Sequence, residues 1–167
     1  YDFVIGSQHC VDNKELYYKT YFQGKTMKEI FRGYYDELLY NITNFNNFDV
    51  VGHLDLIRRY SDEAVAFNFH EVMDRVEVIL RKLISDGKGI EVNAGGFFYP
   101  TAMTNPHPSI LKLYKELGGE IITYGSDAHV PQKIGANYER TMDILKEAGF
   151  RYISYFADRK VEFERIR

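Results

Sequence analysis

Ile122-Thr123-Tyr124-Gly125-Ser126-Asp127-Ala128-His129 is the stretch of sequence that decides the fold and the candidate chemistry of this chain. Its apolar beginning stops at Gly125, which is typical of a buried strand that reaches its end. Asp127 and His129 follow with one residue between them, and side chains two apart on an extended chain share a face. A carboxylate and an imidazole on one face are a plausible pair of metal ligands. In the alternative interpretation Asp127 caps the next helix and His129 packs nearby, and the motif alone leaves both open.

Three other segments repeat this pattern of an apolar run that ends near a glycine and a polar side chain. They are residues 3–9, which end in His9, residues 49–53, which end in His53, and residues 89–96, which contain Asn93 before two glycines. Each segment predicts a strand with a polar group at its C-terminal end. A fifth strand is expected at residues 152–156.

Segments with helical periodicity separate these strands. Thr26 and Glu29 form a capping-box pattern that predicts a helix to about residue 45, with apolar residues at three-to-four spacing. Further helices are expected at about residues 70–85, from residue 108 to about 117, and at about 137–148. Residues 11–23 are expected to be an irregular loop with a short helical turn, and residues 61–68 a polar and aromatic connection. Cys10 is expected to be a small core residue.

The alternation of strands and helices predicts a parallel sheet in an α/β fold. In a (β/α) barrel the C-terminal ends of the strands converge on one face, whereas in an open sheet they spread along an edge. Convergence is the better interpretation because several strands end in side chains of metal-ligand or polar type. These side chains are those of His9, His53, Asp127, His129 and Asn93.

Composition restricts the class of protein. A length of 167 residues predicts one domain, and 45% hydrophobic with 27% charged residues is the balance of a soluble globular protein. A net charge of -3 carries no basic signature, so no nucleic-acid partner is expected. The single cysteine excludes an intramolecular disulfide framework and fits a reducing, cytoplasmic compartment. No apolar run is long enough to span a membrane, so no membrane partner is expected.

Four motifs occur in the order seen in the PHP (polymerase and histidinol phosphatase) superfamily, and the surrounding sequence most resembles its histidinol-phosphatase branch. The motifs are Gly6-Ser7-Gln8-His9, Gly52-His53-Leu54-Asp55, Glu91-Val92-Asn93 and Gly125-Ser126-Asp127-Ala128-His129. The resemblance covers almost the whole chain. It implies a distorted seven-stranded (β/α) barrel, and the hydrolysis of L-histidinol phosphate to histidinol and phosphate in histidine biosynthesis.

The resemblance also implies a centre of two or three divalent metal ions. His9 and His53 would bind one ion, Asp127 a second and His129 a third. Mixed imidazole and carboxylate ligands suit zinc, manganese or iron and do not select among them. Clustered divalent ions activate water and neutralise phosphoryl oxygens, which is what hydrolysis of a phosphomonoester requires.

The chain departs from the family pattern, because the first His-x-His motif, the histidine that follows it and the bridging glutamate are absent. We therefore expect residues 1–167 to be a single partial PHP domain, formed by the C-terminal strands and helices of a (β/α)7 barrel. Undercoordinated metals predict little or no phosphatase activity for this chain alone. An open half barrel also exposes sheet edges and apolar surface, which favours self-association.

Two arginines and one aspartate follow the second strand. Arg58 and Arg59 are candidates for guanidinium contacts to a phosphate, and a solvated surface pair is the alternative. Asp55 is a candidate for orienting a metal ligand, and a helix or turn cap is the alternative.

Four other polar side chains lie at or near the predicted strand ends and helix starts. Asn93 is a candidate substrate contact, with a turn-stabilising amide as the alternative, and Glu91 is expected to lie deeper as a buried hydrogen-bonding group. His70 is expected at the surface and His107 in a loop.

Three classes of function remain open at this stage. The first is a histidinol-phosphatase acting on a small phosphorylated substrate. The second is another PHP phosphoesterase, acting on nucleotides or on protein-tyrosine phosphate. The third is a non-catalytic half barrel that binds metal. The substrate preference of the longer protein would separate the first two classes.

Overall fold

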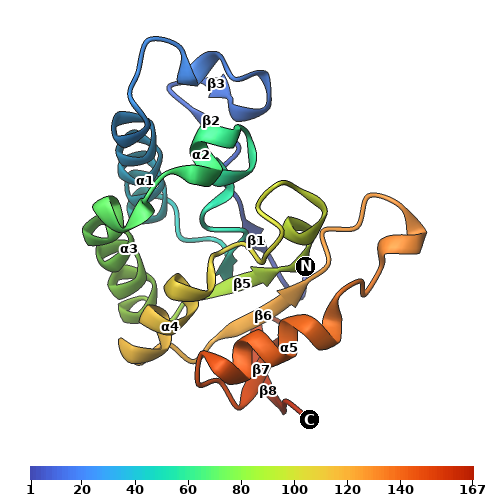
Figure 1. Cartoon of the computed structure of the whole chain (residues 1–167). Helices are drawn as coiled ribbons and strands as arrows, with labels where there is room; N and C mark the ends of the chain where they lie inside the picture. Colours follow the sequence, from blue (N-terminus) through green and yellow to red (C-terminus); the bar gives the residue numbers. More distant parts are fainter.

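A four-stranded parallel sheet forms the centre of the computed structural model, which describes residues 1–167 (Figure 1). Its strands are β1 (Ile5–Gly6), β4 (Val50–Val51), β5 (Gly89–Asn93) and β6 (Ile122–Gly125), in the order β1-β4-β5-β6. Every neighbouring pair is parallel. The predicted α/β fold with a parallel sheet is therefore confirmed, and the C-terminal ends of these strands meet at one edge.

Three long helices connect these strands, a fourth follows β6, and the four cover the outside of the sheet (Figure 1). They are α1 (Met27–Asn44), α3 (Met73–Ser85), α4 (Pro108–Glu116) and α5 (Tyr138–Glu147). Helix α1 contacts α3, α3 contacts α4 and α4 contacts α5, so the helices follow one another in chain order. Helices are present in all four predicted segments. No helix combines the length and the apolar character needed to cross a bilayer.

Helix α1 shows how closely local sequence determines local structure. Glu29 N donates to Thr26 Oγ1 at 3.3 Å, and Thr26 N donates to Glu29 Oε2 at 2.7 Å, which completes the predicted capping box. The predicted apolar stripe is buried against the core along its whole length, at Ile30, Tyr34, Leu38 and Ile42. Burial of one such large side chain contributes about 1.5–3 kcal/mol, so the stripe fixes the helix on the sheet.

The segment after β1 is more ordered than the sequence indicated. Strand β2 (Cys10–Val11) pairs with β3 (Lys14–Glu15) in an antiparallel hairpin. Successive side chains of a strand point to opposite sides, and here Val11 is buried whereas Cys10 is exposed. The prediction of Cys10 as a core residue was therefore wrong. A second expected connection contains the short helix α2 (Asp62–Ala66).

The last predicted strand does not belong to the parallel sheet. Strand β7 (Tyr152–Ala157) pairs antiparallel with β8 (Lys160–Arg165), which the sequence analysis missed. Asp158 and Arg159 both have positive φ, as in a two-residue hairpin turn that matches the twist of its strands. The hairpin lies beside β6 and is tied to it by a side chain, because Ile122 N donates to Ser154 Oγ at 3.1 Å.

Candidate metal centre

The histidines that follow β1 and β4 face each other. The Nε2 atoms of His9 and His53 are 3.1 Å apart, and the two rings stack with centroids 5.0 Å apart. The two residues lie 44 positions apart in the chain, and parallel pairing of β1 with β4 brings them together. The structure thus forms the imidazole pair that the two motifs predicted as ligands of one ion.

His53 is the fixed member of this pair. It is 6% exposed, whereas His9 lies at the surface. The backbone N of His53 donates to Glu91 Oε2 at 3.0 Å, and its Nδ1 is buried without a hydrogen-bond partner. Burial, together with the charges of Arg59 and His9, lowers the pKa of His53 to about 4. The ring is therefore neutral at pH 7, which is the form that binds metal ions, and Nε2 is its available nitrogen.

Asp127 forms the second half of the centre, after β6. Its Oδ2 accepts a hydrogen bond from Arg59 Nη1 at 3.2 Å, and its Oδ1 is 3.5 Å from His129 Nε2. Partial burial works to raise the pKa of Asp127, but the charge and hydrogen bond of Arg59 outweigh it, so the pKa lies below its ordinary value. Asp127 is therefore ionised at neutral pH. His129 is exposed, with 86% of its side-chain surface accessible to solvent.

His53 and Asp127 share a backbone feature, because both are non-glycine residues with positive φ two positions after the end of a strand. Their φ angles are 26° and 52°. Such conformations cost on the order of 1–3 kcal/mol and are concentrated at functional sites. The backbone of His53 is held by Glu91, and Asp127 lies against Gly95, where an added Cβ would be 2.9 Å from Asp127 Cβ. The fold therefore holds both side chains in place despite an unfavourable backbone.

Glu91 lies beneath the centre, as a buried hydrogen-bonding group. Besides His53 N, it accepts a hydrogen bond from Asn93 Nδ2 at 3.1 Å, and burial raises its pKa. Gly125 on the neighbouring strand makes room for its carboxyl group, because a Cβ there would overlap Oε1. A Cβ at Gly52 would instead meet Ser7 Oγ at 2.5 Å. The prediction for Glu91 is confirmed, and its carboxylate supports His53 from below.

Asn93 uses both ends of its amide within the protein. Its Nδ2 donates to Glu91, and its Oδ1 accepts from Gly95 N at 2.9 Å. The side chain is 1% exposed. These contacts are those of the turn-stabilising amide that was the alternative, and a contact between Asn93 and substrate stays a prediction.

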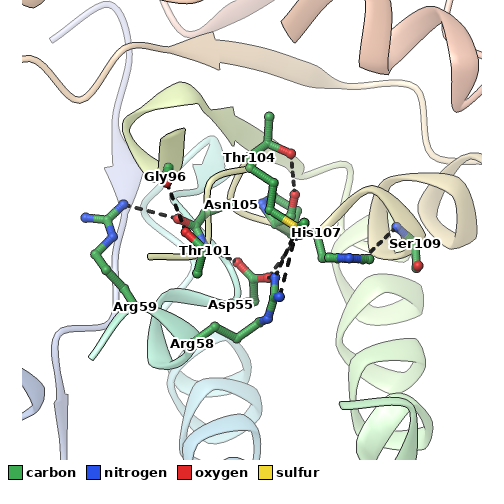
Figure 2. A network of polar contacts seen from close by, with 11 residues as sticks. Asp55, Arg58, Arg59, Gly96, Thr101, Thr104, Asn105, His107 and Ser109 are labelled. Carbon is green, nitrogen blue, oxygen red and sulfur yellow. Dashed lines mark hydrogen bonds and ion pairs between the residues drawn. The ribbon is translucent and has the colours of Figure 1, made fainter. Parts of the chain in front are cut away.

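The two adjacent arginines point in different directions (Figure 2). Arg58 Nη1 donates to Asp55 Oδ2 at 3.3 Å, and its guanidinium lies against Phe69. Arg59 reaches Asp127, donates from Nη2 to Asn105 Oδ1 at 3.3 Å and lies 4.2 Å from the centre of the Tyr99 ring. Both side chains are buried, at 5% and 7% exposure, so the alternative of a solvated surface pair is wrong. Only Arg59 contacts a candidate ligand.

Asp55 contacts none of the four candidate ligands. It is fully buried and accepts hydrogen bonds from Asn105 Nδ2 at 2.7 Å, from His107 N at 2.9 Å and from Arg58. Its side chain caps no helix. Asp55 therefore anchors the loop before α4, and a role in orienting a metal ligand stays a prediction.

Two of the five histidines lie apart from this centre, as expected. His70 is exposed. His107 caps α4, where its Nδ1 accepts from Ser109 N at 3.1 Å (Figure 2). Asn105 was missed, because its only sequence signal is the turn dipeptide Asn105-Pro106, which says nothing of Asp55 fifty positions earlier.

The chemistry of these donors fits divalent cations. Two nitrogens that bind one tetrahedral zinc ion at about 2.0 Å are about 3.3 Å apart, close to the 3.1 Å between His9 and His53. Asp127 and His53 lie near enough for the charge of each to shift the pKa of the other. However, no three His, Cys, Asp or Glu side chains converge in the arrangement of a metal site. The residues form two neighbouring pairs of donors and not one complete ligand set.

A parallel α/β domain with imidazole and carboxylate side chains at the C-terminal ends of its strands belongs to the class of α/β domains with a candidate site at that edge of the sheet. The chain is a member of the PHP domain family, whose model matches residues 1–95.

Related proteins of known sequence carry consistent names. The chain is 31% identical over 166 residues to the histidinol-phosphatase of Lactococcus lactis, covering 97% of this chain and 61% of that protein. It is 28% identical over 166 residues to a probable histidinol-phosphatase of Clostridium acetobutylicum, covering 98% and 64%. The chain thus spans less than two thirds of the length of these relatives.

Two solved structures share the fold. The crystal structure of histidinol phosphate phosphatase from Lactococcus lactis, complexed with zinc, L-histidinol and phosphate, matches with a TM-score of 0.86 and 31% identity, covering 97% of this chain and 62% of that one. The putative histidinol phosphatase of Listeria monocytogenes matches with a TM-score of 0.62 and 25% identity, covering 77% and 48%.

Proposed function

We propose that this chain forms part of a metal-dependent phosphatase that hydrolyses L-histidinol phosphate to histidinol and phosphate, in histidine biosynthesis. The observation that carries the proposal is the gathering of His9, His53 and Asp127 at the C-terminal edge of the sheet. The likeness to a phosphatase structure that contains zinc, L-histidinol and phosphate supports the substrate class. The proposed partner is thus a small phosphorylated molecule.

In this proposal four side chains hold two or three divalent ions. His9 and His53 hold one ion, Asp127 a second and His129 a third. When bound, the ions supply positive charge that neutralises phosphoryl oxygens and activates water for attack. Glu91 keeps His53 in position through its backbone, and the neutral state of the His53 ring leaves Nε2 free for an ion.

Arg59 provides the guanidinium that binds the phosphate. It is the arginine that borders Asp127, and its planar fork can donate two parallel hydrogen bonds to phosphate oxygens. Arg58 is turned toward Asp55 and Met103, so its role in this proposal is to hold the loop before α4.

We further propose that residues 1–167 form the C-terminal strands and helices of a distorted seven-stranded (β/α) barrel, with further metal ligands on other strands. The parallel strand order and the succession of helices support this. Because no three donors converge, the chain alone is expected to have little or no phosphatase activity. The free edge of β1 is the surface through which such a half barrel would associate with itself.

The test is a substrate panel assayed with the longer protein and, in parallel, with the 167-residue chain. We expect the longer protein to prefer L-histidinol phosphate over nucleoside monophosphates and phosphotyrosine peptides in the presence of zinc or manganese. A strong preference for nucleotides or phosphotyrosine would contradict the proposed substrate. Substantial turnover by the 167-residue chain alone would contradict the proposal of a partial metal site.

A non-catalytic metal-binding module is the second candidate. The ion pair between Arg59 and Asp127 favours it, because this pair engages both the proposed phosphate-binding arginine and one proposed metal ligand. This alternative predicts metal binding without turnover of any phosphomonoester, in the longer protein as well as in the chain.

A further inference from the structure

Arg59 contacts Asp127, Asn105 and the ring of Tyr99. The orientation of the Asn105 amide is fixed by Asp55, which lies 50 positions away in the chain. Asn105 Oδ1 accepts a hydrogen bond from Arg59 Nη2 at 3.3 Å, and Asn105 Nδ2 donates to Asp55 Oδ1 at 2.7 Å (Figure 2). Asn105 and Asp55 are both fully buried. No water is needed to complete this connection, because each polar end of the Asn105 side chain has a protein partner.

The chemistry of these groups allows only one orientation of the Asn105 amide. An ionised carboxylate only accepts hydrogen bonds, so the NH2 of Asn105 must face Asp55. A guanidinium only donates, so the carbonyl oxygen of Asn105 must face Arg59. The contact with Asp55 therefore turns the carbonyl oxygen of Asn105 toward Arg59, which donates a hydrogen bond to it.

The backbone of Asn105 is fixed as firmly as its side chain. Asn105 N donates to Asn93 O at 3.0 Å, and Asn93 N donates to Asn105 O at 2.7 Å, which joins the loop to the end of β5. An added Cβ at Gly96 would lie 2.7 Å from Asn105 Oδ1, so the amide fits only because residue 96 is a glycine. The end of the sheet that carries the centre therefore also fixes the position of Asn105.

We propose that Asn105 is a positioning residue that aims the Arg59 guanidinium at the phosphate, and that Asp55 sets the orientation of the Asn105 amide. This inference rests on the proposed function for the identity of the ligand of Arg59. Arg59 donates to Asn105 from Nη2 and to Asp127 from Nη1, so two fixed acceptors define the plane of its fork. Phosphate binding through that plane depends on the relay from Asp55 through Asn105 to Arg59.

A reciprocal pair of substitutions tests the relay. In Asp55→Asn the oxygen at position 55 must stay on His107 N and Arg58, so the new NH2 group faces Asn105. The Asn105 amide then has to rotate, and it turns its own NH2 toward Arg59. The double variant Asp55→Asn/Asn105→Asp restores a donor opposite an acceptor at every contact. Thr101→Val is the matched control, because it loses a buried hydrogen bond to Gly96 O in the same loop and leaves the relay intact.

Two readouts separate positioning from plain stability. The first is the hydrogen-exchange protection of the Arg59 guanidinium by nuclear magnetic resonance of ¹⁵N-arginine-labelled chain, assigned by loss of the signal in Arg59→Lys. The second is the affinity for inorganic phosphate in the presence of zinc. We expect Asp55→Asn to lower both at least about tenfold, the double variant to restore both to within about threefold, and Thr101→Val to change neither.

Each outcome decides the inference. Unchanged Arg59 protection and phosphate affinity in Asp55→Asn would overturn it, as would a folded double variant without recovery. If the single variant does not fold, the double variant decides, and failure of the double variant to fold also contradicts the relay. Loss and recovery of Arg59 protection in a chain that does not bind phosphate, together with a longer protein that does not hydrolyse histidinol phosphate, would reject the proposed function and leave the positioning of Arg59 supported.

Discussion

The two halves of the candidate centre differ in charge, because one contains a neutral imidazole and the other an ion pair. On the imidazole side, His9 and His53 face each other without a counter-ion, and the depressed pKa of His53 keeps its ring neutral. On the carboxylate side, Asp127 is ionised and already paired with Arg59. A cation can join the imidazole side without disrupting an ion pair, whereas at Asp127 it must compete with a guanidinium. We therefore expect the first ion to bind at the histidines.

The largest expected effect is on this imidazole side. His53→Ala removes the buried, fixed nitrogen donor, and we expect zinc affinity of the chain to fall at least about 100-fold, more than for loss of an outer-shell partner. Competition with a chromophoric chelator measures this. His70→Ala, which changes an exposed histidine away from the centre, is the control and should bind zinc as the unmodified chain does. Equal affinities for the two variants would place the first ion elsewhere.

On the carboxylate side, the next largest expected effect is a loss of stability when Asp127 is changed. Asp127→Asn leaves Arg59, whose side chain is 7% exposed, without its charged partner. We expect the free energy of unfolding to fall by about 1–3 kcal/mol, the cost of an unsatisfied buried group. Urea denaturation measures this change. A variant as stable as the unmodified chain would show that the ion pair contributes little and that the two halves do not differ.

Releasing Asp127 from its ion pair with Arg59 should have a smaller effect, and zinc affinity should rise instead of fall. Arg59→Met removes the competing cation at Asp127, and we expect zinc affinity to rise by about threefold or more, because an opposing charge near a partly buried site is lost. Arg58→Met is the matched control, since Arg58 pairs with Asp55 and not with Asp127. Zinc titration of both variants by calorimetry measures the difference. A rise of equal size in both variants would contradict the partition of the two arginines.

The smallest expected effect is on stability at His9. This residue is exposed, so His9→Ala should change the free energy of unfolding by less than about 0.5 kcal/mol while it lowers zinc affinity. Urea denaturation and chelator competition on the same sample provide the two values. A large loss of stability would mean that His9 serves the fold and not an ion.

The sequence predicted those features of the fold that depend on short-range patterns. The capping box at Thr26, the apolar stripe of α1 and the ending of strands at or near glycines each have a local cause, and the structure has them where they were predicted. Strand β8 was missed because its six residues include four charged ones, and its turn has neither glycine nor asparagine. The prediction for Cys10 was wrong because the side of β2 that faces the core decides which of two neighbouring side chains is buried, and this depends on how the strand packs.

The contacts of the centre were predictable only in part. Pattern placed His9, His53 and Asp127 at the ends of parallel strands, and parallel pairing then brings such ends to one edge. Arg58 turns toward Asp55, three positions earlier, whereas the partners of Arg59 lie 46 and 68 positions away, which no local pattern records. Asn105 acquires its contacts from the same long-range packing.

Binding of the first ion between His9 and His53 is tested by a crystal structure of this chain grown with zinc, with anomalous diffraction recorded at the zinc absorption edge. We expect an anomalous peak within bonding distance of Nε2 of both histidines, with any second peak beside Asp127. Zinc bound only at other residues, or ordered imidazoles without a peak between them at saturating zinc, would contradict it.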